Sequence, residues 1–165
     1  MVIRRYIWTL ALAGAVALGL FVLFKGDAPR VKATTTERVV SDWRSGVALQ
    51  GYDPVAYFVN ARAVPGRPEH EAIVAGVTWR FRNQGNQGAF ADSPAVYMPR
   101  FGGYDPIAVA RGVARPGHPE IWMIERGKLY LFYDAESRAA FAAKSAEMLG
   151  AADAKWPEVL KLLTP

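Results

Sequence analysis

An uncharged apolar run near the N-terminus constrains this chain most. Residues Tyr6 to Phe24 (YIWTLALAGAVALGLFVLF) contain no charged side chain. A helix of this length, at about 1.5 Å per residue, approaches the ~30 Å thickness of the hydrocarbon core of a bilayer. Arg4 and Arg5 precede the run, and Tyr6 and Trp8 stand where interfacial aromatic residues are expected. The run therefore predicts one N-terminal transmembrane helix, which contacts the lipid bilayer through residues 6–24.

A cleaved signal peptide is the alternative interpretation of residues 1–25. Its apolar stretch would be shorter, about 7–15 residues, and would end in small residues. This run ends instead in Phe-Val-Leu-Phe-Lys, so we favour an uncleaved anchor. The short positive tail before the run should stay in the cytoplasm. This places a single-pass protein in the inner (cytoplasmic) membrane, with its domain facing the periplasm. Cleavage would release a periplasmic or secreted protein instead.

The rest of the chain is sufficient for one compact domain. Hydrophobic residues make up 52% of the sequence and aromatic residues 12%, a composition that can bury a core. The net charge is +5, but residues 1–33 carry four of these charges. Because the remainder is nearly neutral, we expect no nucleic-acid partner. The absence of cysteine excludes disulfides and thiolate metal sites. We assign residues 26–40 to a polar linker and residues 41–165 to the domain.

Two β-hairpins are predicted within the domain. The first spans His70–Arg82, where apolar and polar residues alternate around an Ala75-Gly76 turn. The second spans Glu120–Tyr133, with Arg126-Gly127 in the turn. The second strand of that hairpin, Leu129 to Tyr133, is apolar or aromatic on both faces, as a covered central strand would be. We expect the two hairpins to form one small antiparallel sheet.

Short helices are predicted between and after the hairpins. A helix within Asn83–Pro99 has Asn83 as its candidate N-cap. After the second hairpin, Asp134 is expected to cap a helix that runs to about Met148 and ends at Gly150. A last helix covers Asp153–Leu163 and has one apolar stripe, formed by Trp156, Val159, Leu160 and Leu163. Hairpins combined with helices in this way predict an α+β domain behind the transmembrane helix.

One hexapeptide occurs twice, as GYDPVA at residues 51–56 and as GYDPIA at residues 103–108. In one interpretation each copy starts a helix, because Asp is a favoured N-cap and Pro is favoured at the first helical position. The repeated tyrosine is then a packing residue with an anchored hydroxyl group. In the other interpretation the two turns meet and bind a ligand through Tyr52, Asp53, Tyr104 and Asp105. The flanking sequences do not match, so the repeat alone does not indicate a duplicated domain.

Several motifs occur together in an order that resembles a known family. They are GYDPVAYF, the run Phe-x-x-x-Pro-x-x-Tyr-x-Pro from Phe90 to Pro99, Gly-Gly-Tyr at residues 102–104, and Gly-Lys-Leu-Tyr-Leu at residues 127–131. Together they resemble the bacterial YHS-domain family over roughly residues 46–160. The resemblance implies a small α+β domain, often exported or attached to metal-handling proteins, for which metal binding is suspected.

One departure from the family pattern bears on metal binding. Many relatives have cysteine where this chain has Asp105, and a carboxylate is a harder ligand than a thiolate. What remains as metal candidates is Asp105 with His70 and His118, and beyond these Asp53, Met98 or Met123. Neither histidine has a partner at the spacing of a metal motif, and methionine is more often a core residue than a ligand. The cofactor, if there is one, is therefore unknown, with a metal ion as the candidate.

No catalytic motif is recognisable in the sequence. It contains no Gly-x-Ser-x-Gly elbow, no phosphate loop and no His-Glu-x-x-His motif. We therefore expect a membrane-anchored extracytoplasmic binding or accessory module rather than an enzyme. The alternatives are a small-molecule or metal-dependent enzyme that uses the same cleft, and a structural subunit of a membrane-protein complex.

Overall fold

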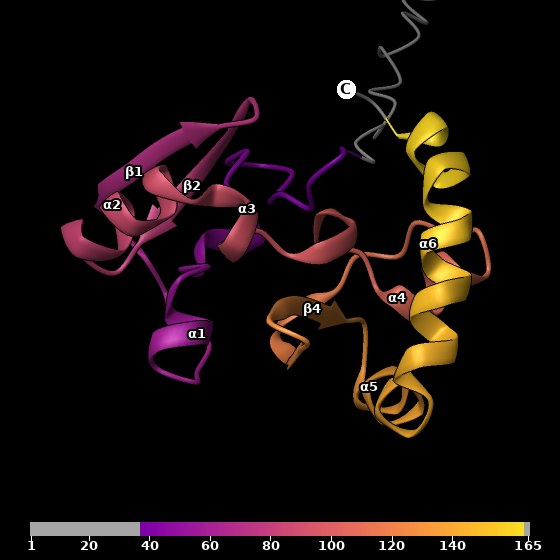
Figure 1. Ribbon diagram of the computed structural model, residues 1–165. Helices are drawn as coiled ribbons and strands as arrows, with labels where there is room; N and C mark the ends of the chain where they lie inside the picture. Colours follow the sequence, from indigo (N-terminus) through magenta and orange to yellow (C-terminus); the bar gives the residue numbers. More distant parts are fainter. Residues whose placement is uncertain (1–36, 164–165) are drawn as a thin grey trace, which may run out of the picture. The chain divides into compact units, whose positions relative to one another are not determined.

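The structure is a computed structural model that describes residues 37–163 (Figure 1). Two antiparallel hairpins and several helices make up this part of the chain, which confirms the α+β class. The elements are η1 (Leu49–Gly51), α1 (Ala56–Val59), β1 (Arg67–Val74), β2 (Val77–Phe81), α2 (Gln84–Asp92), α3 (Pro94–Tyr97), η2 (Arg100–Gly103), α4 (Pro106–Ala110), β3 (His118–Glu125), β4 (Lys128–Phe132), α5 (Ala135–Ala143) and α6 (Ser145–Leu162).

The predicted membrane segment, residues 6–24, lies outside the described residues, as does most of the predicted linker. Between residues 37 and 163, no helix combines the length and the apolar character needed to cross a bilayer.

Both predicted hairpins and both predicted turns are confirmed. Strand β1 pairs with β2 and β3 pairs with β4, each antiparallel. The turn residues Ala75 and Gly76 have φ values of 54° and 77°, and Arg126 and Gly127 have φ values of 51° and 70°. Positive φ at both central positions defines the type I′ turn, whose twist matches that of the flanking strands. Ala75 and Arg126 adopt this strained conformation without being glycine.

The prediction of one sheet is wrong. The hairpins form two separate two-stranded sheets, β1-β2 and β3-β4. The free side of β2 is taken by the segment before η1, because Val47 bridges to Thr78 and the Ala48 N–H donates to the Thr78 carbonyl at 2.8 Å. That edge is therefore occupied locally, and the second hairpin contributes by packing instead of by strand pairing.

The helix caps are confirmed, but one helix boundary is wrong. The side chain of Asn83 accepts from the Asn86 N–H at the start of α2, and that of Asp134 accepts from the Ser137 N–H at the start of α5. The predicted break at Gly150 lies instead at Lys144, where φ is −144° and ψ is 41°. Helix α6 then runs through both Gly150 and Pro157. Gly150 and Pro157 are weak helix formers. The burial of Val159 and Leu163 against the core outweighs this weakness.

The two hexapeptides lie in two copies of one structural unit. We call residues 49–92 the first repeat and residues 100–143 the second repeat. Each contains a 3-10 turn, a short helix, a hairpin and a capped helix in the same order. The hairpin registers also match: Arg67 pairs with Phe81 and His118 with Phe132, each followed by a bulge. The chain therefore has an internal structural duplication that the flanking sequences do not reveal.

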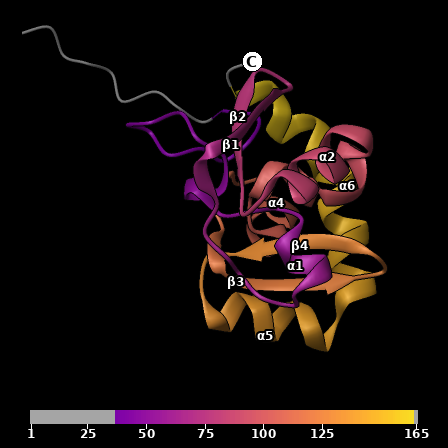
Figure 2. The same cartoon turned by 90° about the vertical axis from the view of Figure 1, so that its left-hand side faces the viewer.

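Strand β4 joins the two repeats into one core. Its side chains alternate, so that Leu129 and Leu131 pack in a cluster with Trp79 and Phe90 of the first repeat. Tyr130 and Phe132 pack instead in a second cluster, which includes Phe141 of α5 and Val159 of α6. Helix α5 packs on the β3–β4 hairpin (Figure 2), and α6 packs against α4. The prediction of a strand covered on both faces is confirmed for residues 129–132, whereas Tyr133, the last residue of the predicted strand, lies after β4 and is exposed.

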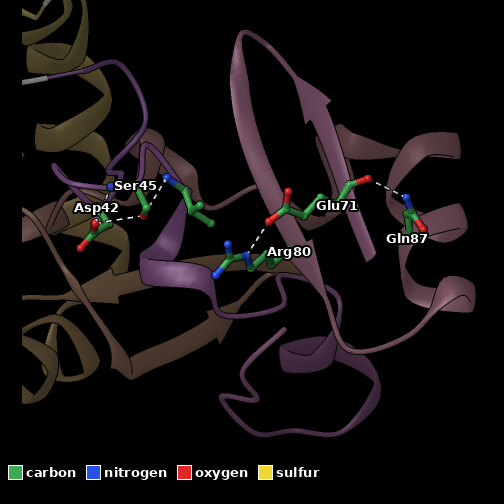
Figure 3. A network of polar contacts seen from close by, with 6 residues as sticks. Asp42, Ser45, Glu71, Arg80 and Gln87 are labelled. Carbon is green, nitrogen blue, oxygen red and sulfur yellow. Dashed lines mark hydrogen bonds and ion pairs between the residues drawn. The ribbon is translucent and has the colours of Figure 1, made fainter. Parts of the chain in front are cut away.

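Polar contacts hold the first hairpin against its helix (Figure 3). The Arg80 guanidinium donates to the Glu71 carboxylate at 2.6 Å, across the β1–β2 pair. On the other edge of β1, the Gln87 side-chain amide of α2 donates to the Glu71 carbonyl oxygen at 2.7 Å. The outer edge of β1 is thus partly covered by its own repeat.

Candidate functional site

Asp53 connects three segments of the first repeat. Its side chain is fully buried. One carboxylate oxygen accepts from the Val55 N–H at 2.8 Å and the Ala56 N–H at 3.3 Å, where α1 begins. The other accepts from the Arg82 N–H at 2.8 Å, after β2, and from the Asn86 side-chain amide at 2.6 Å. Four donors fill the usual acceptor capacity of a carboxylate, so Asp53 is occupied as a structural residue.

Asp105 has the corresponding role in the second repeat, with fewer partners. It is 1% exposed. One oxygen accepts from the Ile107 N–H at 2.8 Å and caps α4, and the other accepts from the Tyr133 N–H at 3.0 Å, after β4. The predicted N-cap is confirmed at Asp105. In the first copy the N-cap residue of α1 is Val55, and Asp53 accepts from the N–H groups of Val55 and Ala56 from just upstream of the helix. Asp53 and Asp105 bind different partners in different repeats, and no hydrogen bond joins them among residues 37–163.

The two repeated tyrosines lie in different surroundings. Tyr104 is buried, and its hydroxyl group donates to the Glu37 carbonyl oxygen at 2.5 Å. Burial, helped by the negative charge of Glu37, raises the pKa of Tyr104 to about 12. Tyr52 is half-buried, and its hydroxyl group donates to the Glu120 carboxylate at 3.1 Å. Burial and that carboxylate raise the pKa of Tyr52. Tyr104 fits the packing interpretation, whereas Tyr52 keeps one side toward solvent.

The metal candidates do not form a cluster. Among the residues that the structure describes, no three His, Asp or Glu side chains are close enough together to hold a metal ion. His118 is exposed, and its Nδ1 accepts from the Glu120 N–H at 3.2 Å. His70 lies on β1, in the other hairpin. Met98 and Met123 are half-buried and pack against the two apolar clusters, as core residues do.

A cavity of about 210 Å³ lies in the second repeat, between α4 and α5. Its walls come from α4, from the loop that follows α4 and from the first turns of α5. The side chains that define its chemistry are Ile107, Arg111, Arg115, Asp134, Glu136 and Ser137. Residues 37–163 provide no ion-pair partner within 4.0 Å for either arginine. The Arg115 guanidinium instead lies 3.3 Å from the centre of the Tyr133 ring.

Sequence reasoning missed Arg111, Arg115 and Ser137 as site residues. Each lies in a stretch without a recognisable motif, and the cavity forms only when α4 and α5 come together. The available signal was the repeat itself. Alignment of the second hairpin on the first places Ser137 at the position of Asn86, which is the residue that completes the hydrogen bonding of Asp53.

Comparison with known proteins adds no relative. No family model matches the chain, and neither a curated protein nor a solved structure matches it.

Proposed function

We propose that this chain is a membrane-anchored binding or accessory module of the YHS type, with its domain on the periplasmic side of the inner membrane. The anchor is supported by the uncharged run of residues 6–24 and by Arg4 and Arg5 before it. The resemblance of residues 46–160 to YHS domains supports an exported accessory domain. A membrane-protein partner beside the anchor would then be the natural target of such a module.

One observation carries the choice of binding over catalysis. The repeated acidic residues, which are the best candidates for acid–base chemistry, are buried and accept hydrogen bonds from backbone N–H groups. General acid–base catalysis needs a group within hydrogen-bond reach of the substrate proton. All acceptor positions of Asp53 are used by donors within the protein. This suits a residue that holds a binding domain together. The cavity beside α5 provides a concave site for a ligand.

The location is tested on the full-length chain with a C-terminal tag. Cell fractionation shows whether the chain is attached to the membrane, and N-terminal sequencing shows whether the apolar run is cleaved. Protease digestion before and after permeabilisation of the outer membrane shows on which side of the inner membrane the domain lies. We expect an intact N-terminus in the membrane fraction and a domain digested only after permeabilisation. Val16→Arg places a charge in the middle of the apolar run, which raises the free energy of membrane insertion by about 2.5–3.5 kcal/mol. This variant should release the chain from the membrane. Lys25→Gln, outside the run, is the matched control.

Two results would overturn this proposal. One is a chain that stays in the cytosol, and the other is turnover of a substrate by the purified chain. The family resemblance adds a metal-related role for Asp105, which titration of the purified full-length chain with copper, zinc and iron tests. Stoichiometric uptake that Asp105→Ala abolishes would support this role, and equal behaviour of the two proteins would remove it.

A further inference from the structure

The most exposed large apolar side chains among residues 37–163 are Trp43, Ile73 and Leu162. Their exposed fractions are 74%, 76% and 71%, and the other large apolar side chains at the surface of this part are at most 60% exposed. Single exposed apolar residues are common on protein surfaces and need no explanation. Whether these three carry information therefore depends on where they lie relative to one another.

The first described residues lie beside the helix that ends at Leu162. The Val40 N–H donates to the Gly102 carbonyl oxygen at 2.8 Å. The neighbouring Phe101 ring packs edge-on against Trp156 of α6, with 5.5 Å between the ring centres. Leu162 is the last residue of α6. The beginning of the described chain and the end of α6 are thus joined through one buried cluster.

The same segment also lies beside the tip of the first hairpin. Ile73 pairs with Thr78 on β2, and Thr78 also bridges to Val47, shortly after Trp43. Figure 1 and Figure 2 both show the β1–β2 turn, the C-terminal end of α6 and the beginning of the described chain at one end of the domain, opposite α5. We call this the entry end, because the described chain begins there. The three apolar side chains therefore belong to one end of the molecule.

A hydrogen-bonded turn holds Trp43 outward at this end. The Asp42 carboxylate accepts from the Arg44 N–H at 3.1 Å and from the Ser45 N–H at 2.9 Å, and Figure 3 shows the contact with Ser45. The Gly46 N–H closes the turn by donating to the Asp42 carbonyl oxygen at 2.7 Å. The Arg44 guanidinium lies 4.7 Å from the centre of the Trp43 ring, a cation–π contact. The turn thus presents an indole and a guanidinium together to solvent.

The exposed charges of the entry end are all basic. In residues 37–46, 72–79 and 160–163 they are Arg38, Arg44 and Lys161. The two carboxylates of these segments, Glu37 and Asp42, are half-buried and accept from neighbouring serine hydroxyl groups. Within residues 37–163, none of the three basic side chains forms an ion pair. Tryptophan accompanied by arginine and lysine is typical of surfaces at the membrane–water interface, where cations contact lipid phosphates.

The sequence limits the distance between the entry end and a bilayer. The apolar run ends at Phe24, and only residues 25–36 separate it from the first described residue. At about 3.3–3.6 Å per residue, this stretch cannot span more than about 40–43 Å. Such a tether would keep the entry end at an effective concentration on the order of millimolar at the lipid surface. A weak contact with lipid is then sufficient to hold the domain.

We propose that the entry end of the domain docks on the lipid bilayer, with Trp43, Ile73 and Leu162 inserted at the interface. The exposed basic side chains of this end contact lipid phosphates. The inference rests on the proposed membrane anchor and adds a second membrane contact, which fixes the orientation of the domain. Because α5 lies at the opposite end, the cavity between α4 and α5 stays accessible from the periplasm.

The test uses the full-length chain in vesicles of phosphatidylethanolamine and phosphatidylglycerol. The chain has no cysteine, so Trp43→Cys, Ile73→Cys and Leu162→Cys each carry a single fluorescent label. Lipids with a nitroxide near the headgroup should quench each of these labels at least twofold. Val59→Cys is the matched control, because Val59 is 60% exposed and lies on α1, away from the entry end. Its label should not be quenched.

The discriminating variant combines Trp43→Ser and Ile73→Ser with the label at Leu162→Cys. We expect this label to lose its quenching, because one remaining apolar side chain does not hold the end on the lipid. Val59→Ser combined with Val113→Ser, two exposed apolar residues outside the entry end, should leave the quenching unchanged. All four replaced side chains are exposed, so the unfolding temperature should not change. Loss of quenching then reports docking and not unfolding.

Either of two outcomes overturns the inference. In one, the labels at the entry end are quenched no more than the label at position 59. In the other, quenching appears only in vesicles that hold many chains, which assigns the entry end to a second copy. Flotation of the vesicles separates docking from anchoring. A chain that floats with unquenched labels contradicts docking alone, whereas a chain that does not float contradicts the anchor as well.

Discussion

At the residue scale, the two buried aspartates show how one side chain type organises a fold. Each connects the start of a helix to the end of a hairpin through its two oxygens. Sequence predicted the capping half of this role, because Asp before Pro is a local signal. It could not predict the bonds to Arg82 and Tyr133, because those donors lie 29 and 28 residues away.

We expect Asp53→Ala to destabilise the protein more than Asp105→Ala. Removal of Asp53 leaves four donors unsatisfied, and removal of Asp105 leaves two. Each buried donor left unsatisfied costs about 1–3 kcal/mol. Loss of a cap alone costs about 0.5–2 kcal/mol. Urea titration gives both free energies of unfolding. Equal losses in the two variants would contradict the difference in hydrogen bonding.

Tyr104 should make the protein sensitive to alkaline pH. Its pKa of about 12 in the folded state exceeds the value of about 10 expected in the unfolded chain. The folded state therefore holds the proton more tightly, so this contribution to stability is present below about pH 10 and is lost as pH rises toward 12. We expect the free energy of unfolding to fall less steeply over this range in Tyr104→Phe. Lysines titrate similarly in both proteins, so parallel curves would refute the assignment.

At the element scale, Gly66 and Gly117 occupy corresponding positions directly before the two hairpins, where other parts of the chain lie too close to leave room for a Cβ atom. A Cβ atom on Gly66 would lie 2.6 Å from the backbone of Arg80, and one on Gly117 would lie 2.6 Å from Leu131 and 2.8 Å from the Gly103 carbonyl oxygen. The sequence contains both glycines, but nothing near them in the sequence indicates why glycine is needed there. Their role depends on strands β2 and β4, which come into contact with them only on folding.

We expect Gly117→Ala to destabilise the protein by about 1–3 kcal/mol, as overpacking does. The neighbouring backbone cannot give way as a flexible side chain could. Gly150→Ala is the matched control, because Gly150 lies in α6 with no atom within 4 Å of its added Cβ. That variant should stabilise the protein by about 1 kcal/mol through helix propensity. Thermal unfolding of both variants measures the contrast, and a neutral Gly117→Ala would refute the close approach.

At the scale of the described domain, β4 makes the repeats interdependent. Leu129 and Leu131 complete the apolar cluster of the first repeat, while Tyr130 and Phe132 belong to the other cluster. Neither cluster can be buried without this strand. The two repeats thus resemble each other in hydrogen bonding and still cannot be regarded as independent folding units.

A chain that ends at Pro99 should therefore fail to fold, although it contains the whole first repeat. It lacks Leu129 and Leu131, and Trp79 and Phe90 would remain partly exposed. We expect a circular dichroism spectrum without cooperative thermal unfolding, whereas the full-length chain unfolds in one transition. A matched control is the full-length Leu131→Ala variant, which should fold with a loss of about 2–5 kcal/mol. Cooperative unfolding of the shortened chain would contradict this interdependence.

Local chemistry in the sequence was enough for the α+β class, the positions of both hairpin turns, the helix caps at Asn83, Asp105 and Asp134, and the apolar stripe of α6. Each depends on neighbours within a few residues or on a short periodicity. Only the tertiary structure decided that the hairpins form two sheets, that the hexapeptides lie in duplicated units, and that a charged cavity opens at Ser137. These features depend on contacts between residues far apart in the chain, where burial and close packing, rather than local conformational preference, determine which segments meet.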